Sequence, residues 1–437
     1  MNKYVIGQQM YTFCNEIFPI CRSITGDGVR ETLKYFEKGI SEEGVKLDVH
    51  EVPSGTHVFD WTVPKEWRIQ EAYIEDESGH RVIDFRQNNL HVLGYSVPVD
   101  AWVDLDELKK HVYTQTDQPD VIPYVTSYYK ERYGFCMSEN QKNSLKSGKY
   151  HMHIDSELFD GVLNYAEAVI SGETDREVFF STYFCHPSMA NNECSGPTLA
   201  VELIKYVARM KSRKCTYRFV FIPETIGSIT YLSQGNTLKH LKDKMIAGFN
   251  LSCVGDNRDY SIIESMYGDT LADRVLRNVL KYHTNDKYST YSFLERGSDE
   301  RQYNAPGIEL PVVCFCRSKF GEYSEYHTSA DDMTLVSPEG FQGSFDVMTQ
   351  IIDALEWNQN YRINVLGEPQ LGKRGLYPTV SQKGNYDEVM PLKNLIAYAD
   401  GRNDLVWISD KIGVSIAHLI PIVKRLMDNS LLEVSHG

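Results

Sequence analysis

The stretch Thr182-Tyr-Phe-Cys-His-Pro-Ser-Met-Ala-Asn-Asn-Glu-Cys-Ser-Gly196 decides the fold that we expect for this chain. It begins inside an apolar run, 178–184, that is typical of a buried strand. His186 follows the end of that strand, and a polar turn then leads into a helical pattern at Ser195. In open α/β sheets, the loops after the strands meet over one crevice that binds ligands and metal ions. The stretch therefore predicts a site at the carboxyl edge of a sheet.

Strand-like and helical patterns alternate along residues 158–358. The expected strands cover 178–184, 217–222, 245–254, 260–264 and 311–315, and the expected helices cover 198–211, 270–283 and 338–357. This alternation is typical of a mainly parallel sheet with helices on both faces. We therefore expect an α/β fold. Residues 3–40 are expected to form two helices that pack against it, with Arg22 and Arg30 at the break in an exposed ion pair or an anion site.

The segment 46–154 has a different texture, with short alternating runs separated by Pro, Gly and charged turns. This pattern favours a β-rich lobe inserted into the α/β domain, which would then comprise 1–45 and 155–358. We expect the core of the lobe to contain four aromatic residues, Trp61, Trp67, Tyr95 and Trp102. His151 and His153 share one face of a strand at a spacing that can chelate a metal. Because no partner is apparent, we interpret them as ordinary strand residues.

Residues 370–437 form the expected third domain. Helical patterns at 404–413 and 415–429 precede a closing strand at 431–434, an arrangement that resembles a winged helix-turn-helix. The second helix carries only two basic residues, Lys424 and Arg425, whereas a recognition helix usually makes more phosphate contacts. We expect this domain to pack against protein, and DNA binding stays open as an alternative.

The composition limits the classes of function. The chain has 437 residues, 24% of them charged, and a net charge of −15, which argues against non-specific binding to nucleic acid or anionic membranes. No apolar stretch approaches the roughly 20 residues that span a bilayer, so we expect no membrane association. The nine cysteines are scattered and lack metal-binding CxxC spacing. A reduced, cytoplasmic setting is therefore expected.

Three later segments offer partners for His186. Glu224 directly follows the strand 217–222, Asp256 follows the strand 245–254, and His327 lies within Glu325-Tyr-His-Thr-Ser-Ala-Asp-Asp332. Because the carboxyl ends of parallel strands meet at one edge of a sheet, we expect these side chains over one crevice.

The order of these motifs resembles the co-catalytic zinc aminopeptidase superfamily, which also includes glutaminyl cyclases. The motifs are a His, Ala-Asn-x-x-x-Ser-Gly, Glu-x-x-Gly-Ser, Gly-Asp and Tyr-His-Thr-x-x-Asp, all within 158–358. The whole chain looks like a bacterial family of aminopeptidase-like proteins with an inserted lid lobe and a winged-helix tail. The resemblance implies a Zn²⁺ that activates water for attack on an amide carbonyl, with Glu224 as the general base.

The chain departs from the family's ligand set. Asn192 stands where the family has a bridging Asp, and Glu193 could substitute for that Asp if the turn shifts by one residue. Thr225 stands where the family has a carboxylate ligand after the base. The family's third carboxylate aligns nearer Ser252 than Asp256. We therefore expect one Zn²⁺ per chain, held by His186, His327 and a carboxylate, with Glu224 as ligand or base.

Further candidates surround this set. The stretch Ser298-Asp-Glu-Arg301 resembles the family's loop before the last strand, so Asp299 and Arg301, together with Tyr326, are candidate substrate-binding residues. A solvated run of charges is the alternative for Asp299 and Arg301. Asp331 is expected to order its loop or to orient His327. Cys185 and Cys194 are interpreted as small buried thiols.

We expect a metal-dependent hydrolase of aminopeptidase type that acts on a small peptide or another amide, with the lobe roofing the cleft. A single-zinc acyl transferase or cyclase is one alternative. A non-catalytic protein that senses a ligand is another, which Asn192, Thr225 and the winged-helix tail favour and the retained histidines and Glu224 oppose. A homo-oligomer also stays open.

Overall fold

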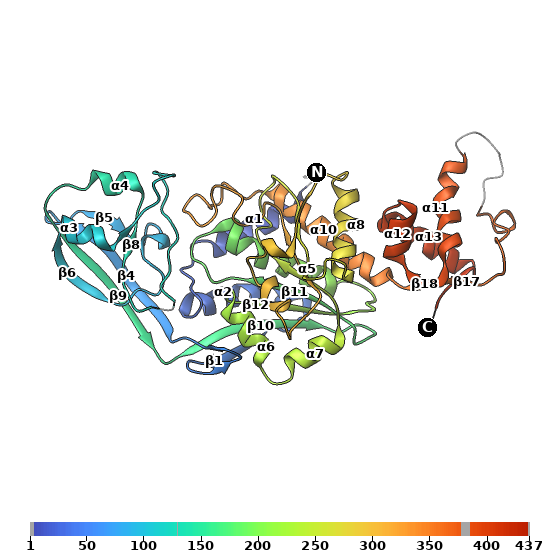
Figure 1. Ribbon diagram of the computed structural model, residues 1–437, viewed down its shortest axis with the longest axis horizontal. Coiled ribbons are helices and arrows are strands. Elements are labelled where there is room, and N and C mark those ends of the chain that lie inside the picture. The colour runs from blue at the N-terminus through green and yellow to red at the C-terminus, as the bar shows by residue number, and fades with distance from the viewer. Residues whose placement is uncertain (1–3, 129, 377–384, 436–437) are drawn as a thin grey trace.

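The computed structural model describes residues 4–128, 130–376 and 385–435. Three parts follow one another along the long axis of the molecule (Figure 1). The inserted lobe lies at one end, the α/β body lies in the middle, and the C-terminal helices and strands lie at the other end.

An eight-stranded sheet forms the centre of the body, in the order β1-β10-β12-β11-β13-β16-β14-β15. Its strands are β1 (Asp48–Pro53), β10 (Val162–Ile170), β11 (Glu177–Tyr183), β12 (Thr216–Ile222), β13 (Met245–Leu251), β14 (Ser261–Ile263), β15 (Ser289–Tyr291) and β16 (Val312–Cys316). The four central strands β12, β11, β13 and β16 pair in parallel. Every residue of β11 is buried, as expected for a strand covered on both faces. The expected mainly parallel α/β fold is confirmed.

Alternate side chains of β11 pack against different helices. Val178 and Phe180 contribute to a core with the long helices, whereas Phe179 contributes to a core that includes Ile229 and Tyr303. The first group is α1 (Val5–Ile17), α2 (Asp27–Ile40), α5 (Ser195–Ala208), α8 (Leu271–His283) and α10 (Pro338–Trp357). The second is α6 (Ile226–Ser233), α7 (Thr237–Lys244) and α9 (Glu300–Tyr303). The period of two along a strand therefore accounts for both layers.

The lobe is built on an antiparallel sheet in the order β5-β4-β9-β6. Its strands are β4 (Glu66–Asp76), β5 (Arg81–Asp84), β6 (Val99–Asp104) and β9 (Lys149–Phe159), and smaller elements are β2 (His57–Val58), β3 (Trp61–Thr62), β7 (Val112–Tyr113), β8 (Phe135–Cys136), α3 (Leu105–Leu108) and α4 (Glu139–Ser144). The short helical turns of the chain are η1 (Ser41–Glu43), η2 (Asn89–His91), η3 (Lys109–His111), η4 (Ala190–Cys194), η5 (Phe293–Glu295) and η6 (Gly372–Arg374).

One expectation about the core of the lobe is wrong. Trp67 and Tyr95 are buried as expected, but Trp102 is 52% exposed because it lies on the outer face of the edge strand β6. The start of the lobe at residue 46 stays a prediction, and β1 pairs with β10 of the large sheet rather than with the lobe.

The C-terminal part has the winged-helix form that the sequence predicts. The helices are α11 (Asn385–Tyr398), α12 (Leu405–Ile412) and α13 (Ile416–Asp428), and the strands β17 (Asn360–Ile363), β18 (Asp400–Asp404) and β19 (Leu432–Val434) form a three-stranded sheet. Lys424 and Arg425 are exposed on α13.

Buried polar contacts join the winged helix to α8 of the body. Asn278 of α8 is 2% exposed, accepts a hydrogen bond from Ile416 N, and donates to Ser409 Oγ and Asp410 Oδ1. Nearby, Arg274 donates two hydrogen bonds to the carboxylate of Asp404, at 2.8 and 3.0 Å. The packing against protein that the sequence predicts for this domain is thus present within the chain.

Among the helices in the described parts of the chain, none is by itself long and apolar enough to cross a membrane, and only the bent pair of α12 and α13, counted together, meets those criteria.

Asp404→Asn should lower the free energy of unfolding by about 1 kcal/mol at neutral pH, because it removes a charged pair and keeps a side chain that can cap α12. Burial raises and Arg274 lowers the pKa of Asp404, and the net result is a pKa below its usual range. The contribution of the Asp404 charge to the free energy of unfolding is therefore present above the unfolded-state pKa of about 3.9. It is lost as the pH falls through the lower folded-state pKa.

Urea unfolding followed by circular dichroism at neutral and acidic pH checks this expectation. Asp404→Ala, which also removes the cap on Trp407 N, serves as the larger-effect comparison. A difference between wild type and Asp404→Asn that stays constant down to pH 2 would contradict the assignment.

Candidate active site

His186 lies three residues beyond the end of β11, at the carboxyl edge of the parallel strands. Its side chain is almost fully buried, and its backbone carbonyl accepts a hydrogen bond from Arg22 Nε at 3.2 Å. Arg22 itself is 1% exposed and also donates to Ile17 O and Cys194 Sγ. The expectation of an exposed ion pair at Arg22 is therefore wrong, because this side chain ties the break between α1 and α2 to the site.

Three potential metal donors gather at this position. One ligand atom each of Cys185, His186 and Glu193 lies within 4.8 Å of the others, and all three residues are buried. His186 Nδ1 lies directly against Glu193 Oε1. Both oxygens of Glu193 are buried without a hydrogen-bond partner among the described residues. Burial raises the pKa of this carboxyl to about 8. A positive charge beside it would stabilise the ionised form.

A π-helical turn, η4, brings Glu193 rather than Asn192 to His186. The backbone N–H groups of Asn191 and Asn192 donate to the buried carboxylate of Asp331, at 2.6 and 3.0 Å. This confirms the loop-ordering alternative for Asp331. Asn192 Nδ2 donates to the hydroxyl of Tyr183 at 2.9 Å, and Asn192 Oδ1 is buried without a partner among the described residues.

His327 lies next to His186, with the ring centroids 5.3 Å apart. The ring of Tyr326 stacks on it at 3.8 Å. The backbone of His327 has a positive φ of 56°, a strained conformation for a residue other than glycine. Burial lowers the pKa of both imidazoles to about 3. Arg22 adds to this effect at His186, and His186 adds to it at His327. Both rings are therefore neutral at physiological pH, which is the form that binds metal ions.

Glu224 lies on the other side of the His186 ring, with Oε2 3.7 Å from His186 Nε2. Burial raises its pKa well above the usual range, and the nearby carboxylates of Asp299 and Glu193 add to this effect. A group of this kind can hold a proton near neutral pH.

A strained turn positions Glu224. Thr225 has φ 65° and ψ −74°, and Ile226 N donates to Glu224 O at 2.8 Å, so the backbone makes a γ-turn of the rare type. Asp299 Oδ1 anchors this turn by accepting hydrogen bonds from Thr225 N and Ser228 Oγ, both at 2.8 Å. Arg301 Nη2 donates to Thr225 Oγ1. Asp299 is fully buried, so it does not belong to a solvated run of charges.

Asp256 lies elsewhere in the loop after β13. Its oxygens accept hydrogen bonds from Asn191 Nδ2, Ser318 N and Ser318 Oγ at 2.8–3.0 Å. Within the part of the chain that the structure describes, the donors grouped with His186 include neither Asp256 nor His327, but the His327 ring lies beside that of His186.

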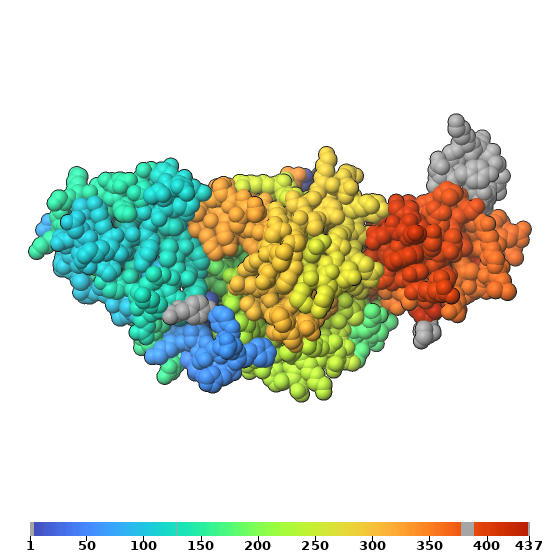
Figure 2. Space-filling view, viewed as in Figure 1, coloured from blue at the N-terminus to red at the C-terminus, as the bar shows by residue number. Residues whose placement is uncertain are grey.

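The lobe supplies the roof of the site. Tyr124 N donates to His327 O, Ser329 N donates to Ile122 O, and Pro123 forms a β-bridge with Thr328. The ring of Tyr124 lies 4.8 Å from that of His186 and 5.1 Å from that of His327. Figure 2 shows the orange surface of the loop after β16 against the teal surface of the lobe.

A small cavity of about 80 Å³ remains beside the site. It is lined by Ile24, Tyr128, Cys185, His186, Glu224, Thr225 and Ile226. A cavity of this size admits one small group of a substrate.

The structure thus brings together four of the predicted residues, His186, Glu193, Glu224 and His327. It gives Asn192 and Asp256 other partners, and it places Asp299 and Arg301 behind the turn that holds Glu224. Sequence reasoning placed Cys185 beside the site but interpreted it as a small buried thiol, and it missed that its sulfur lies among the potential metal donors. It also missed Tyr124, because no local pattern links this residue to strand ends that follow more than fifty positions later.

The residues fit a zinc ion by their chemistry. Imidazole nitrogen, carboxylate oxygen and thiolate sulfur are the donors that Zn²⁺ takes in proteins. The unpartnered carboxylate of Glu193 and the neutral rings of His186 and His327 match what a bound cation requires. No second group of this kind is found among the described residues of the body.

Family comparisons agree with this architecture. A family model described as a domain of unknown function (DUF4910) matches residues 11–358, and one described as a winged helix-turn-helix matches residues 359–434. A protein from Clostridium acetobutylicum, provisionally named as a polysaccharide biosynthesis protein with an aminopeptidase-like domain, is 42% identical over 427 residues. The match covers 96% of this chain and 96% of that protein.

Solved structures share the fold. A crystal structure from Clostridium acetobutylicum, provisionally named as a peptidase, has a TM-score of 0.92 at 41% identity and covers 99% of this chain and 98% of that chain. A zinc aminopeptidase from Bacillus subtilis has a TM-score of 0.58 at 11% identity, and the match covers 79% of this chain and 94% of that chain. The expected likeness to zinc aminopeptidases is therefore confirmed at the level of the fold.

Asp299→Ala should lower the free energy of unfolding by about 2 kcal/mol, because it leaves Thr225 N without an acceptor, whereas Ser228 Oγ keeps its hydrogen bond to Thr225 O. Asp299→Asn keeps an acceptor oxygen and should cost less. Chemical denaturation followed by circular dichroism measures both, with Asp160→Ala, an exposed loop position, as the control. A loss for Asp299→Ala no larger than that of the control would show that the γ-turn does not need this anchor.

Proposed function

We propose that this chain, which belongs to the DUF4910 family and continues into a winged helix-turn-helix domain, is a metal-dependent hydrolase that cleaves an amide bond. One observation carries the proposal. The buried, unpartnered carboxylate of Glu193 lies against the neutral ring of His186, and Glu224 lies on the opposite side of that ring. Without a cation this carboxyl is protonated at neutral pH, since burial raises its pKa to about 8, and a bound cation would allow it to ionise as a ligand.

We propose that one Zn²⁺ per chain is held by His186, Glu193 and His327. A zinc ion bound there would polarise an amide carbonyl and acidify a water molecule. Asn192, Thr225 and Asp256 have other partners, which supports a single ion rather than two.

The residues of the chain supply the proton transfers. Glu224 would take the proton of the attacking water, since it lines the small cavity together with His186. Its raised pKa allows it to keep that proton until the leaving amine needs it. Tyr124 and the loop around it would exclude bulk water, because the lobe closes over both imidazoles.

We further propose that the substrate is a small molecule with an acylated amine. The cavity of about 80 Å³ supports a small group at the reacting carbonyl. The relative from Clostridium acetobutylicum is named for polysaccharide biosynthesis as well as for an aminopeptidase-like domain, which adds N-acylated sugars to amino-acid amides as candidates. We also propose a cytoplasmic location, supported by nine cysteines that are all free thiols in the structure.

A ligand-sensing role without catalysis is the second candidate. Arg301 donates to Thr225, the position at which the aminopeptidases carry a metal ligand, and this contact favours a site that has changed its use. Zinc bound at His186 without turnover of any amide would favour this role.

His186→Gln and His327→Ala should each remove one equivalent of tightly bound Zn²⁺ relative to wild type, because each deletes an imidazole ligand. Metal analysis of protein dialysed against a zinc buffer measures the loss, and circular dichroism shows whether each variant is folded. His80→Ala, which changes an exposed histidine, is the control and should retain the wild-type metal content. Unchanged zinc content in both folded site variants would contradict the proposed ligands.

Glu224→Gln should keep the zinc and lower kcat by roughly 10²–10⁴-fold, because the amide cannot accept a proton. The measurement is hydrolysis of a panel of amino-acid amides and N-acylated sugars, first screened with wild type. Glu322→Gln, the same change at an exposed glutamate in the loop after β16, serves as the control and should retain most of the activity. Equal rates for Glu224→Gln and wild type would show that Glu224 is not the base.

A further inference from the structure

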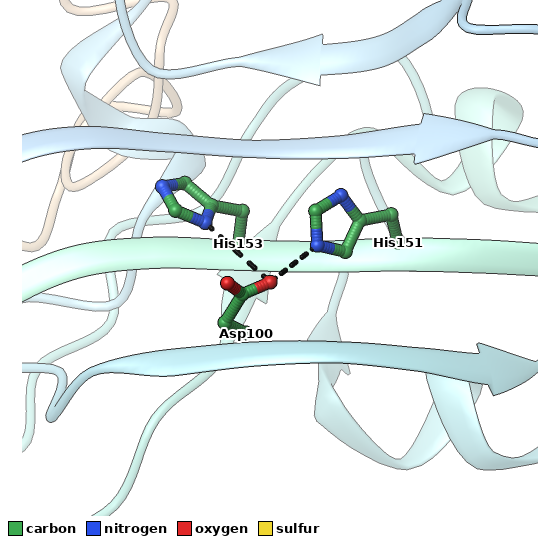
Figure 3. Close-up of side chains that lie close together, drawn as sticks. All are labelled: Asp100, His151 and His153. Carbon is green, nitrogen blue, oxygen red and sulfur yellow. Dashed lines mark hydrogen bonds and ion pairs between the residues drawn. The ribbon is translucent and has the colours of Figure 1, made fainter.

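The outer face of the lobe sheet carries two histidines and an aspartate that the proposed function does not use. Along β9, Met152 and Ile154 point into the core of the lobe, so His151 and His153 point outward. On the neighbouring strand β6, Asp100 is paired directly with His153. Figure 3 shows the three side chains converging over the two strands.

The three side chains are close enough to share one ion. His151 Nε2 lies 2.5 Å from Asp100 Oδ1, and His153 Nδ1 lies 3.8 Å from the same oxygen. One donor atom from each residue lies within 4.8 Å of the other two. His153 Nδ1 is buried and has no hydrogen-bond partner among the described residues, although its side chain lies at the surface. A nitrogen so placed has a lone pair or a proton that the protein leaves unused.

Aromatic rings hold both imidazoles in orientation. Trp102 stacks on His151 with the ring centroids 5.1 Å apart and an angle of 10° between the planes. Tyr73, on β4, stacks on His153 at 4.8 Å and 26°. Because these contacts fix the ring planes, the nitrogens face Asp100 before any ligand arrives, and little side-chain entropy remains to be lost on binding.

The surrounding charges favour a cation. Asp100 accepts a hydrogen bond from His151, which lowers the pKa of the aspartate, so its carboxylate is ionised at neutral pH. Glu75 is paired with His151 on β4 and adds a second acid to this face. The guanidinium of Arg81, which lies over the ring of Tyr73, forms ion pairs with Glu71 and Asp84, so its charge is largely compensated.

We propose that Asp100, His151 and His153 form a second metal site, which binds Zn²⁺ or a similar divalent transition-metal ion. Two imidazole nitrogens and one carboxylate oxygen suit such ions and not Ca²⁺ or Mg²⁺, which prefer oxygen ligands. Ligands at about 2.0–2.2 Å from a tetrahedral ion lie roughly 3.3 Å from one another. The observed 2.5 and 3.8 Å bracket that spacing, so small side-chain rotations suffice.

The site leaves one coordination position open. Asp100 is 72% exposed, so the side of the ion away from the sheet faces solvent and would bind water or a donor group of a ligand. The ion also links β6, at the edge of the lobe sheet, to β9. This inference does not depend on the proposed hydrolase, because the three residues belong to the lobe and none of them lines the cavity beside His186.

Metal titration of the full chain, stripped with a chelator, tests the proposal. Isothermal calorimetry with Zn²⁺ should show two binding events in wild type. Asp100→Asn, His151→Ala and His153→Ala should each weaken one event at least tenfold and leave the other in place. His57→Ala, which changes an exposed histidine in the same part of the chain, is the matched control and should retain both events.

Fluorescence locates the ion independently. Cu²⁺ bound at this site should quench Trp102 because this indole stacks on His151. The quenched component should be absent in Trp102→Phe and should persist in His186→Gln. Circular dichroism confirms that each variant is folded, which we expect because all three residues lie on the solvent side of the sheet.

The two metal proposals can fail separately. If the lobe variants leave both the stoichiometry and the quenching of wild type unchanged, the second site does not exist, whatever happens at His186. If the event sensitive to His186→Gln is missing but the lobe event is present, the second site stands and the zinc proposed for hydrolysis is overturned.

Discussion

The burial of the Glu193 side chain in the turn between β11 and α5 is the constraint on which the rest of the site depends. Glu193 is fully buried against His186, so the surroundings must balance its charge or keep it protonated. Arg22 contributes one buried positive charge from the first pair of helices. Asp331 holds the π-helical turn that aims Glu193 at the imidazole. Three distant parts of the chain therefore meet at this site: the N-terminal helices, the central strand β11 and the loop near residue 330.

Much of the fold follows from local patterns in the sequence. The run 178–184 is apolar because β11 is covered on both faces, and the helix expected at 338–357 agrees with α10 because Ser337 and Pro338 mark its start. Trp102 shows the limit of this reasoning. Its size favours a core position, but β6 is an edge strand and its alternation places this ring outside. Which face of a strand is buried depends on neighbours that are distant in the sequence.

The site was predictable to the extent that strand ends determine it. His186 and Glu224 closely follow β11 and β12, His327 lies in the loop after β16, and their order along the chain indicated a shared crevice. The choice of Glu193 over Asn192 was not predictable, because it depends on a π-helical turn that rotates the following side chains. The γ-turn at Thr225 was equally hidden, since a β-branched residue rarely adopts a positive φ. The contacts of Thr225 with Asp299 and Arg301, which are distant in the sequence, explain why the chain tolerates it here.

The hydrogen bonds between the lobe and the loop of His327 have a consequence for the working cycle. Ile122 and Tyr124 pair with Ser329 and His327 through their backbones. If the lobe moves away to admit a substrate, these backbone hydrogen bonds must break. The His327 ring then also loses its contact with Tyr124. The site would then be complete only while the lobe is closed. Water and other molecules that enter the open form would meet a site whose groups are not yet in place.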